Sequence, residues 1–441
     1  MNYGIISRIK ITEVLISAYH SVCVLGLGYI GLPTASTFAT HGLKVIGVDT
    51  NPEIVSGLNN GHVHLFEPGL RTLVQAALGS GNLLVSDRPV EADAFIIAVP
   101  TPFRADKSAD LRAVKAAAEA IQPQLRKGNL VILESTSPPR TTIDVVAPIL
   151  EKSGLKAGAD FHLAYSPERV LPGQILRELI ENTRVIGGVN PASAEAGRSL
   201  YSAFVTGDII LTDATTAEMV KLMENTFRDI NIAAANEFSR LAEGFGVDIW
   251  EAIALANRHP RVHILNPGPG VGGHCISVDP WFLVEAAPDT ANLVRAARQV
   301  NDSQPAYLVN FLRRRLGSLD QLTIAALGLS YKADVDDVRE SPAIHTVELL
   351  AQAGMRVNVF EPYRADLSLE HAETCATLED AVQSADVLLL LVGHSQFRSL
   401  EPAQMRNITP ARVAVDTVQA WDRVSWQSAG FQFLRLGDGK N

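Results

Sequence analysis

The sequence predicts an α/β protein with two Rossmann-like, doubly wound domains joined by a helical central domain. Near the start, an apolar segment leads into a glycine-rich turn, a helical pattern and a second apolar segment, which is the order of a βαβ unit. From Thr212 to about Arg315, apolar residues recur at helical spacing, with no strand pattern before a glycine-rich loop near residue 268. A strand–turn–helix–strand order then returns. We therefore divide the chain into an N-terminal extension (1–20), a first α/β domain (21–211), a helical domain (212–316) and a second α/β domain (317–441).

The composition limits the classes of partner. The chain has 441 residues, enough for about three domains of roughly 150 residues each. It is 47% hydrophobic and 20% charged, as globular proteins are, and its formal net charge of −10 argues against nucleic acid or an anionic membrane surface as the main partner. The sequence contains no run of about 18 or more apolar residues, so no membrane span is expected. The first twenty residues lack the continuous apolar core of a signal peptide. Three cysteines, an odd and sparse set, favour a reducing compartment, the cytoplasm.

The first βαβ unit carries the fingerprint of a dinucleotide site. The expected elements are a strand over Ser21–Leu25, the turn Gly26-Leu27-Gly28-Tyr29-Ile30-Gly31, a helix over Leu32–Thr40 and a strand over Lys44–Val48. In such a turn Gly26 permits the bend, Gly28 lets the backbone approach a pyrophosphate, and Gly31 allows close helix–strand packing. The acid that follows the second strand, Asp49, hydrogen-bonds a ribose 2′-hydroxyl and repels a 2′-phosphate, which favours NAD over NADP. The alternative, a plain glycine-rich turn with a surface aspartate, is disfavoured by the complete pattern.

Polar residues follow the other strands of this domain. The expected elements are strands over Ala94–Val99, Leu130–Leu133 and Phe161–Tyr165 and a helix over Leu111–Ile121. Thr101, Thr136 and the pair Glu168-Arg169 come just after these strands. Each residue alone is more often a surface residue than a ligand contact. Because ligands of doubly wound folds bind at the carboxyl ends of the strands, their repeated placement there makes them candidate contacts.

A second constellation is the loop from Pro267 to Pro280, in which dense glycine and proline residues surround Cys275. Such a loop lets backbone approach a ligand closely and keeps the thiol out of a core. A thiolate is the best protein nucleophile for an aldehyde. His274 or a nearby lysine can favour the thiolate, and Asp279 can orient a water or a lysine. The alternative is a small apolar filler, the usual role of a free cysteine and the one expected for Cys23; for Cys275, spacing alone leaves both readings open.

Two groups of basic residues lie in the helical region. Lys221, Asn225 and Arg228 fall at i, i+4 and i+7, on one face of a helix, where they suit an anionic or hydroxyl-rich ligand. A solvated face is the usual alternative, which the apolar neighbours of this segment disfavour. His259 and Arg261 flank a proline just before the glycine-rich loop. We also expect one long helix in this region to mediate a dimer.

The second α/β domain repeats the layout of the first without its full glycine fingerprint. The expected elements are strands over Leu322–Leu327, Arg356–Phe360, Val387–Val392 and Arg412–Asp416 and a helix over Pro342–Ala353, after a helical run over Thr290–Leu316. Tyr331, Lys332 and Arg339 occupy the first crossover of this domain. They are candidate ligand contacts by the same strand-end rule.

Taken together, the motifs resemble a known family. The chain carries, in order, GLGYIGLP, VDTNPE, AVPTP, STSPP, YSPERVLPG, AEMVKLMENTFRDINIA, ANRHPRV, PGPGVGGHCISVDPW and GLSYKADVDDVRESP. This set resembles the UDP-glucose/UDP-mannose dehydrogenase superfamily from about Ser21 to the C-terminus. The loop GGHCISVDP is similar to that of the UDP-N-acetylhexosamine dehydrogenases, since the UDP-glucose enzymes typically carry a lysine where this chain has Val278. NRHPRV followed by PGPGVGGHC is most similar to the UDP-N-acetyl-D-mannosamine dehydrogenases.

The resemblance implies a four-electron oxidation of the C6 hydroxyl of UDP-N-acetyl-D-mannosamine to the uronate, with two NAD per turnover, for surface polysaccharide biosynthesis. It implies that Cys275 attacks the C6 aldehyde to give a thiohemiacetal, that hydride loss makes a thioester, and that water hydrolyses it. Lys221 would exchange protons and stabilise oxyanions, and Glu168 would act as base in the hydrolysis. The domain 21–211 would bind NAD, the domain 317–441 would bind the UDP-sugar, and the enzyme would be a homodimer or a higher homo-oligomer.

The same resemblance assigns site residues one by one. The implied catalytic residues are Cys275, Lys221, Asn225, Asp279 and Glu168. The implied NAD contacts are Gly26, Gly28, Tyr29, Ile30, Gly31, Asp49, Thr101, Thr136 and Arg339. The implied contacts to the sugar nucleotide are Arg169, Val170, Lys221, Asn225, Arg228, His259, Arg261, Gly272, Tyr331 and Lys332. No metal is implied.

Two positions depart from the family pattern. Arg140 stands where the family often has glycine, which puts the shape of that loop in question, and Ser166 stands where close relatives often have cysteine.

Other functions stay open beside the one that the resemblance implies. UDP-N-acetylglucosamine and UDP-glucose are the alternative substrates. A two-electron hydroxyacid dehydrogenase of similar build would have no need for Cys275, and an NAD-sensing binding module would need neither Cys275 nor Lys221.

Overall fold

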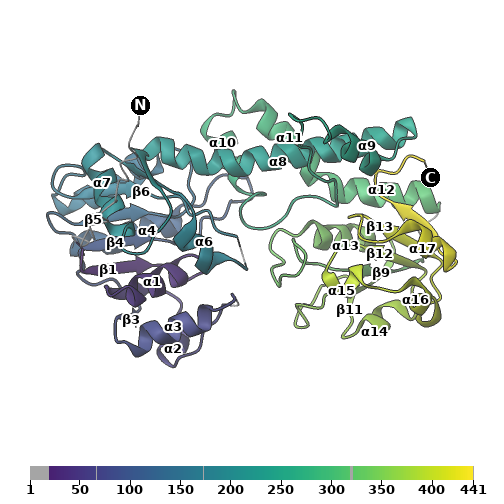
Figure 1. Ribbon diagram of the computed structural model, residues 1–441, viewed down its shortest axis with the longest axis horizontal. Coiled ribbons are helices and arrows are strands. Elements are labelled where there is room, and N and C mark those ends of the chain that lie inside the picture. The colour runs from purple at the N-terminus through teal and green to yellow at the C-terminus, as the bar shows by residue number, and fades with distance from the viewer. Residues whose placement is uncertain (1–18, 66, 172, 318–320, 441) are drawn as a thin grey trace, which may run out of the picture. The chain divides into compact units, whose positions relative to one another are not determined.

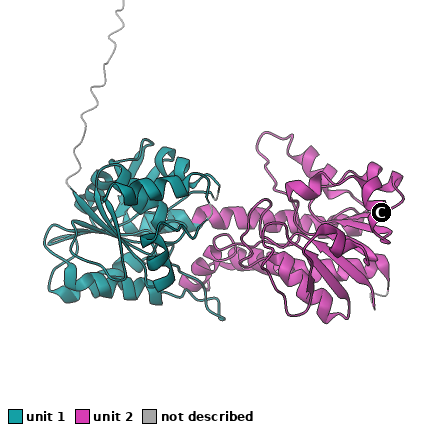
Figure 2. Cartoon of the chain, turned by 90° about the horizontal axis from the view of Figure 1, so that it is seen from below, with its two compact units in different colours: residues 1–222 teal, residues 223–441 magenta. Residues whose placement is uncertain are grey.

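The computed structural model describes residues 19–65, 67–171, 173–317 and 321–440. Of the expected N-terminal extension (1–20), residues 1–18 lie outside this part of the chain. The chain forms two compact units, residues 1–222 and 223–441, which Figure 2 shows in different colours. The boundary falls within one helix, α8 (Ala214–Phe245). Each unit has its own sheet and is described by itself.

The first unit is built on an eight-stranded sheet in the order β3-β2-β1-β4-β5-β6-β7-β8 (Figure 1). Its strands are β1 (Ser21–Leu25), β2 (Lys44–Val48), β3 (Leu83–Ser86), β4 (Ala94–Ile97), β5 (Leu130–Leu133), β6 (His162–Tyr165), β7 (Arg184–Gly188) and β8 (Ile209–Asp213). Among these strands of the described chain, each neighbouring pair is parallel except β6 and β7. The strand order reverses between β1 and β4, and doubly wound folds bind ligands at such a reversal. The expected doubly wound parallel sheet is confirmed, with one reversed pair that the sequence did not predict.

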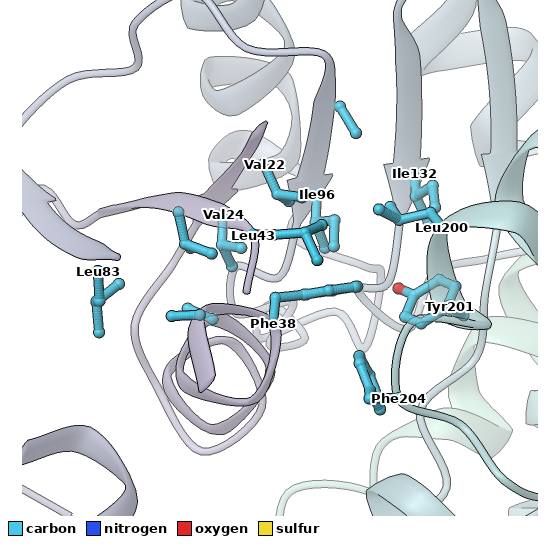
Figure 3. Close-up of a cluster of buried hydrophobic side chains, with 14 of the residues drawn as sticks. Val22, Val24, Phe38, Leu43, Leu83, Ile96, Ile132, Leu200, Tyr201 and Phe204 are labelled. Atoms are coloured by element: carbon cyan, nitrogen blue, oxygen red, sulfur yellow. The ribbon is translucent and has the colours of Figure 1, made fainter. Parts of the chain in front are cut away.

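Alternation along the strands gives this sheet two apolar faces. The helices of the unit are α1 (Gly31–Thr40), α2 (Pro52–Asn59), α3 (Leu70–Gly79), α4 (Arg112–Ile121), α5 (Ala147–Leu150), α6 (Ile175–Glu181) and α7 (Pro191–Tyr201), with the short η1 (Gln122–Gln124), η2 (Thr142–Val146) and η3 (Glu151–Ser153). Val22 and Val24 of β1 pack with Phe38 of α1 on one face, as Figure 3 shows. Cys23 and Leu25 belong to the other face, which α4 and α5 cover. Cys23 is fully buried, so its expected role as a core residue is confirmed.

The second unit contains a six-stranded parallel sheet in the order β11-β10-β9-β12-β13-β14. Its strands are β9 (Thr323–Leu327), β10 (Arg356–Phe360), β11 (Glu373–Thr374), β12 (Val387–Leu390), β13 (Val413–Asp416) and β14 (Gln432–Arg435). Its covering helices include α13 (Pro342–Gln352), α14 (Leu378–Val382), α15 (Ser395–Arg398), α16 (Pro402–Ile408) and α17 (Arg423–Ser428). Ile324 and Ala326 face one apolar core and Ala325 and Leu327 the other, so this sheet too is covered on both sides. The second Rossmann-like domain is therefore confirmed.

The helical region that follows the first sheet and precedes the second along the chain has the predicted pattern, with two differences. After α8, its helices are α9 (Ile249–Ala256), α10 (Asp279–Ala286), α11 (Asn292–Asp302) and α12 (Gln304–Leu316). The helical region expected from Thr212 begins at Ala214, because Asp213 ends β8 and its carboxylate accepts the amide of Thr216 at 2.9 Å, as a helix cap does. The single run expected over residues 290–316 is two helices, with Pro305 in the first turn of the second. Of the helices in the described ranges, none has the length and apolar character needed to cross a membrane.

Candidate functional site

The glycine turn of the first unit is packed so closely that side chains are excluded at two of its positions. Gly26 follows β1 with a φ of 93°, and a Cβ there would lie 2.5 Å from the carbonyl oxygen of Ala98. A Cβ on Gly31 would lie 1.7 Å from the carbonyl oxygen of Gly26. At Gly28, by contrast, no atom of the described residues lies within 4 Å of the Cβ position. The backbone at Gly28 is therefore open to a ligand, as the approach of a pyrophosphate requires.

The first turn of α1 and the acid after β2 complete this cradle. Ile30, the residue before α1, makes no side-chain cap, so the positive end of the helix dipole faces the turn without a carboxylate or hydroxyl over it. The Asp49 carboxylate accepts the amide of Leu27 at 2.9 Å and that of Asn51 at 2.9 Å, which fixes it beside the turn. Tyr29 is half-buried in the same turn. These residues fit NAD, since the open start of α1 suits a pyrophosphate and a carboxylate such as Asp49 suits a ribose hydroxyl.

Two threonines lie at the same edge of the sheet. Thr101 and Thr136 follow β4 and β5, which are neighbours, and both are half-buried. The hydroxyl of Ser135 donates to the carbonyl of Val99 at 2.7 Å and so joins the two segments that carry them. The strand-end rule thus brings these two predicted contacts to the edge that carries the glycine turn.

Arg140 adopts the left-handed conformation that glycine favours. Its φ is 75°, a left-handed conformation in which glycine carries no penalty and other residues pay about 1–2 kcal/mol. Its amide donates to the carboxylate of Glu218 at 2.5 Å, and its guanidinium pairs with Asp144 at 2.7 Å. These contacts offset the strain, so the loop shape that the sequence put in question is explained.

Glu168 belongs to a buried charge cluster that the sequence did not predict. The guanidinium of Arg184 lies 2.6 Å from the carboxylate of Glu168 and 3.3 Å from that of Glu134, and it donates to the hydroxyl of Ser166 at 3.0 Å. The hydroxyl of Tyr201 donates to Glu134. Burial, together with the nearby negative charge of Glu168, raises the pKa of Glu134 despite the attraction of Arg184. Ser166 thereby has a structural contact, and the cluster fixes Glu168 at the end of β6.

The residues next to Glu168 help to fold its loop. The amide of Arg169 donates to the Glu168 carboxylate at 2.7 Å, and its guanidinium donates to the carbonyl of Thr183. Val170 is partly buried against the apolar core of the first unit. Lys221, on α8, is buried as well, with 8% of its surface exposed.

In the second unit, Cys275 lies half-exposed in the glycine-rich loop before α10. A Cβ on Gly272 would lie 3.0 Å from Cβ of Tyr331, and one on Gly273, whose φ is 86°, would lie 2.9 Å from the Tyr331 ring. The amide of Gly273 donates to the carbonyl of Arg339 at 3.0 Å. The glycines are therefore required because the loop lies directly against the first crossover of the second sheet.

The chain around Cys275 is fixed by two predicted polar residues. Asp279 begins α10, is almost fully buried, and donates its amide to the carbonyl of Cys275 at 2.8 Å. The side-chain amide of Asn225 donates to the Asp279 carboxylate at 2.5 Å. Asn225 and Asp279 thus tie the long helix to the cysteine loop. Lys221 lies one helical turn before Asn225 on α8.

His274 faces an acid that the sequence analysis missed. Its Nδ1 lies 3.6 Å from the Asp337 carboxylate and 3.0 Å from the Arg339 guanidinium, while Arg339 itself bonds Asp337 at 2.6 Å. Burial lowers the pKa of His274, but its interactions with Asp337 and Cys275 outweigh this and raise it to about 9. Water screens part of this attraction, since 38% of the His274 side chain is exposed. The only sequence signal for Asp337 was an acid two residues before Arg339, and the same loop contains two further aspartates, which the sequence does not distinguish from it.

In the second sheet, the acid at the position that corresponds to Asp49 is Glu361. Glu361 follows β10, as Asp49 follows β2, but its carboxylate is buried. It accepts the amides of the two residues after Gly328, at 2.6 and 2.9 Å, and contacts Nε2 of His394 at 3.1 Å. Both acids therefore hold their own turns, but the Glu361 carboxylate is also fully buried and paired with His394, whereas Asp49 is half-buried, so the second sheet does not repeat the ribose site of the first. Lys332, in the same crossover, is exposed.

The remaining predicted contacts lie on the surface of the second unit. Arg228 is exposed on α8. His259 and Arg261 are exposed in the turn after α9, where Nδ1 of His259 accepts the amide of Arg261 at 3.3 Å. Within the described ranges, no group of three or more histidine, cysteine, aspartate or glutamate residues is arranged to hold a metal.

A dinucleotide cradle and a thiol in a loop against a second Rossmann-like sheet define an NAD-dependent dehydrogenase. Family models confirm the class: the NAD binding domain of the UDP-glucose/GDP-mannose dehydrogenase family matches residues 20–205, its central domain matches 215–303, and its UDP binding domain matches 325–423. The chain belongs to this family and is a nucleotide-sugar dehydrogenase. The second sugar nucleotide in the name of the family is GDP-mannose, and not the UDP-mannose expected from the sequence.

Individual relatives cover nearly the whole chain. A UDP-N-acetyl-D-mannosamine dehydrogenase of Methanocaldococcus jannaschii is 47% identical over 95% of this chain and 97% of its own length. An NDP-N-acetyl-D-galactosaminuronic acid dehydrogenase of Ralstonia solanacearum is 48% identical over 91% of this chain and 96% of its own. Among solved structures, a UDP-D-ManNAc dehydrogenase of Pyrococcus horikoshii has a TM-score of 0.88 and 40% identity, covering 96% of this chain and all of the other.

Proposed function

We propose that this enzyme oxidises the C6 hydroxyl of UDP-N-acetyl-D-mannosamine to the carboxylate of UDP-N-acetyl-D-mannosaminuronate, with Cys275 as a covalent nucleophile. The observation that carries the proposal is the placement of Cys275: half-exposed in a glycine loop, next to His274 and hydrogen-bonded through its backbone to Asp279. A structural cysteine would be packed, as Cys23 is. The relatives that bear the name of this reaction support the choice of sugar.

The proposed reaction balances as two oxidations and one hydrolysis. When bound, NAD accepts one hydride in each of the two oxidations. The alcohol first loses a hydride and a proton to become the C6 aldehyde. The thiolate of Cys275 then forms a C–S bond with C6, and the resulting thiohemiacetal loses a second hydride and a proton to give a thioester. Water attacks the thioester, the C–S bond breaks, and the carboxylate and the thiolate are released. The covalent bond keeps the aldehyde from escaping between the two oxidations.

The other proposed catalytic residues act on protons and developing charge. Lys221 exchanges the proton of the C6 hydroxyl and stabilises the oxyanion of each tetrahedral state with its cation. Asn225 and Asp279 position the groups around C6 through their mutual hydrogen bond. Glu168 accepts a proton from the hydrolytic water. Its carboxylate has about four lone-pair sites, and the hydrogen bonds from Arg169 and Arg184 occupy only two of them.

The proposed binding roles are divided among three domains. Residues 21–211 bind NAD, residues 212–316 form the central domain, and residues 317–441 bind the UDP-sugar. Lys332 and Tyr331 hold the uridine diphosphate, since an exposed cation beside a half-buried ring suits a phosphate and a base. Arg228, His259 and Arg261 contact the sugar nucleotide, and Arg339 contacts NAD. The reducing conditions that three unpaired cysteines favour fit the cytoplasm, where UDP-sugars and NAD occur.

A substrate panel tests this function. Purified enzyme with NAD and UDP-N-acetyl-D-mannosamine is expected to form two NADH per sugar, with a kcat/KM about ten-fold or more above that for UDP-N-acetylglucosamine, UDP-N-acetylgalactosamine or UDP-glucose. NADH absorbance gives the rates, and mass spectrometry of the product gives the acid. One NADH per sugar with free aldehyde would contradict the four-electron course and favour the two-electron alternative. No NADH from any UDP-sugar would overturn the proposal as a whole.

The second unit also supports the proposed homodimer. Apolar side chains stand exposed on α8 within this unit: Met223, Phe227, Phe238, Leu241 and Phe245, between 43% and 79% exposed. Exposed apolar patches on one element of a globular protein commonly mark an interface. A second copy of this chain is the proposed occupant, because two such stripes match each other in character.

A charge in this stripe is expected to weaken the dimer. Phe227→Glu should raise the dimer dissociation constant about ten-fold or more, since it buries a carboxylate in an apolar contact. Light scattering coupled to gel filtration measures the mass over a dilution series. Val424→Glu on α17 is the matched control, because Val424 is 68% exposed and Phe227 is 71% exposed. A wild-type chain that elutes as a monomer at every concentration would contradict the dimer.

A further inference from the structure

His394 lies where the strand order of the second sheet reverses. β10 and β11 extend the sheet on one side of β9, and β12, β13 and β14 extend it on the other; doubly wound folds bind ligands at such a reversal. Gly328 follows β9 with a φ of 88°, and a Cβ on it would lie 2.6 Å from Cβ of Val392, which follows β12. The segments that leave these two strands are therefore in direct contact. His394, in the second of them, is fully buried.

The hydrogen bonds of His394 define which ring nitrogen carries the proton. The backbone amide of Asp334 donates to Nδ1 at 2.9 Å, so Nδ1 holds a lone pair and the proton of the neutral ring lies on Nε2. Nε2 lies 3.1 Å from the Glu361 carboxylate and 3.3 Å from the hydroxyl oxygen of Ser330. Because the Ser330 hydroxyl donates its own hydrogen to the carbonyl of Lys332 at 2.6 Å, its oxygen is an acceptor for Nε2. Both nitrogens of the buried ring are therefore used.

The imidazole joins the two ends of a short turn, Ser330–Asp334. Nε2 contacts the first residue of this turn and Nδ1 the last. The middle of the turn carries Tyr331 and Lys332, the proposed contacts of the uridine diphosphate. Because both ends of the turn are bonded to one rigid side chain, the backbone path between them depends on His394.

A second set of contacts holds the end of the turn at Asp334. Its φ is 60°, in the left-handed region that residues other than glycine avoid. Its carboxylate accepts the amide and the hydroxyl of Ser395, at 2.8 and 2.6 Å, and the hydroxyl of Tyr363 at 3.1 Å. The ring centre of Tyr363 lies 5.0 Å from that of His394. The segments that follow β9, β10 and β12 thus all contribute to the shape of one turn.

The Glu361 carboxylate has other partners besides His394. It accepts the backbone amides of Leu329, Ser330 and Tyr363, at 2.6, 2.9 and 3.0 Å. Burial opposes the charge on Glu361, but the hydrogen bonds from His394 and from these amides outweigh burial and lower the pKa of the carboxyl. Loss of the imidazole would therefore leave Glu361 bonded to the backbone, whereas the end of the turn would lose its bond to Nδ1.

We propose that His394 is a positioning residue for the nucleotide: its bond to the Asp334 amide sets the shape of the turn Ser330–Asp334, which carries the two proposed contacts of the uridine diphosphate. The proposal rests on the UDP-sugar site proposed above for this domain. His394 forms no bond to the substrate, since its ring is fully buried and both nitrogens have partners in the protein. The affinities for UDP and for the UDP-sugar should therefore change together, and the chemical steps at C6 should not change.

Calorimetric titration with UDP tests this without turnover. His394→Phe keeps a ring but neither nitrogen, and it is expected to raise the dissociation constant of UDP about ten-fold. His394→Asn should bind UDP within about three-fold of the wild type, since its side-chain oxygen is attached at Cγ, as Nδ1 is, and can accept the Asp334 amide. His394→Gln places an amide nitrogen in the position of Nε2, so it keeps only the bond to Glu361 and should bind UDP as weakly as His394→Phe.

Steady-state kinetics should separate binding from chemistry. In His394→Phe, the KM for UDP-N-acetyl-D-mannosamine is expected to rise about ten-fold, with kcat within about two-fold of the wild type, because the lost interaction is made equally in the ground state and the transition state. The dissociation constant of NAD should be unchanged, since the NAD cradle belongs to the first unit. A residue that only stabilised the fold would not divide KM, kcat and NAD binding in this way.

Two further variants come from the same sheet. Tyr363→Phe removes only the hydroxyl bond to Asp334, at a residue that is 43% exposed, and should raise the dissociation constant of UDP about two-fold to three-fold. Asn358→Leu is the control for stability. Asn358 is buried within β10 and donates to the carbonyl of Ala381 at 3.3 Å and the hydroxyl of Ser384 at 3.2 Å. Its replacement should lower the unfolding temperature and leave UDP binding unchanged.

The outcomes distinguish this inference from the proposed function. An unchanged dissociation constant of UDP in His394→Phe, or in Tyr363→Phe if the first variant does not fold, would overturn the proposal. Better UDP binding by His394→Gln than by His394→Asn would also overturn it, and so would an equal loss in Asn358→Leu. Failure of the proposed function would appear instead as a wild-type enzyme that binds UDP but forms no NADH with any UDP-sugar.

Discussion

Replacing Cys275 with serine is expected to lower the rate of uronate formation by about 10³-fold or more, with NAD binding unchanged. A serine hydroxyl keeps the size and the loop position of the thiol. It ionises far less readily, however, because an alcohol is a much weaker acid than a thiol. The thiohemiacetal cannot form at a useful rate, so the second oxidation is lost. The ratio of NADH to acid product distinguishes the two oxidations, because the first oxidation releases NADH without acid.

The first oxidation need not fail in this variant. If Cys275→Ser still converts the alcohol to the aldehyde, a trapping reagent such as a hydrazine should capture free aldehyde with one NADH per sugar. The structure supports this separation, because the NAD cradle at Gly26 and Asp49 belongs to the first unit and Cys275 to the second. Binding of NAD, followed by tryptophan fluorescence or calorimetry, is therefore expected to match that of the wild type.

Cys375→Ser is the matched control, since Cys375 is the other half-exposed thiol of the second unit. It should turn over at the wild-type rate. Normal acid formation by Cys275→Ser would contradict covalent catalysis and favour direct oxidation of an aldehyde hydrate. Equal losses in the two cysteine variants would indicate a general effect of thiol removal on the fold rather than a nucleophile.

The parts of the fold that local sterics dictate could be predicted from the sequence. The strands over Ser21–Leu25 and Lys44–Val48 match their predicted bounds, because short apolar runs on either side of a glycine turn and a helical segment leave few alternatives. The roles given to Gly26 and Gly31 correspond to backbone contacts of 2.5 and 1.7 Å at their Cβ positions. The strand-end rule also predicted that Thr101 lies at the edge that carries the glycine turn, where the structure has it, since the rule depends only on chain direction.

Features that depend on contacts between distant segments were missed. Nothing in the segment Arg184–Gly188 shows that it runs antiparallel to its neighbour, because a short buried strand carries the same apolar pattern in either direction. Arg184 and Glu134 lie 50 residues apart, and each alone resembles a charged residue at the end of a strand. Asp337 was passed over because its partner His274 lies in another loop, 63 residues earlier by number. Such pairs become visible only when the fold brings them together.

The buried cluster around Arg184 leads to the largest expected effect on stability. Arg184→Met is expected to destabilise the first unit by about 3–5 kcal/mol, because Glu134 and Glu168 would remain buried without their cation. The side chains of Arg184, Glu134 and Glu168 are 4%, 0% and 9% exposed, so water cannot replace the lost contacts. Thermal unfolding followed by circular dichroism measures the change in the midpoint of the transition assigned to this unit.

A surface pair in the same unit separates burial from charge. Arg198 and Glu195 form an ion pair on α7 with side chains 44% and 53% exposed. Arg198→Met is expected to cost less than about 1 kcal/mol, as exposed pairs usually do. An equal loss in Arg184→Met and Arg198→Met would mean that the buried cluster does not hold the unit together.

Neutralising the acids should restore part of what Arg184→Met loses. Because its pKa is raised, Glu134 binds a proton more tightly in the folded protein, so its contribution to stability is complete below its ordinary pKa of 4.5 and declines as the pH rises toward about 7. Glu134→Gln should remove this decline, since an amide keeps a polar group beside Tyr201 without titrating. Combining Glu134→Gln and Glu168→Gln with Arg184→Met should then be less destabilising than Arg184→Met alone, because no unpaired carboxylate stays buried. If the triple variant is instead as unstable as the single one, the packing of the arginine over the Tyr201 ring, at 4.2 Å, and not its charge, holds this region together.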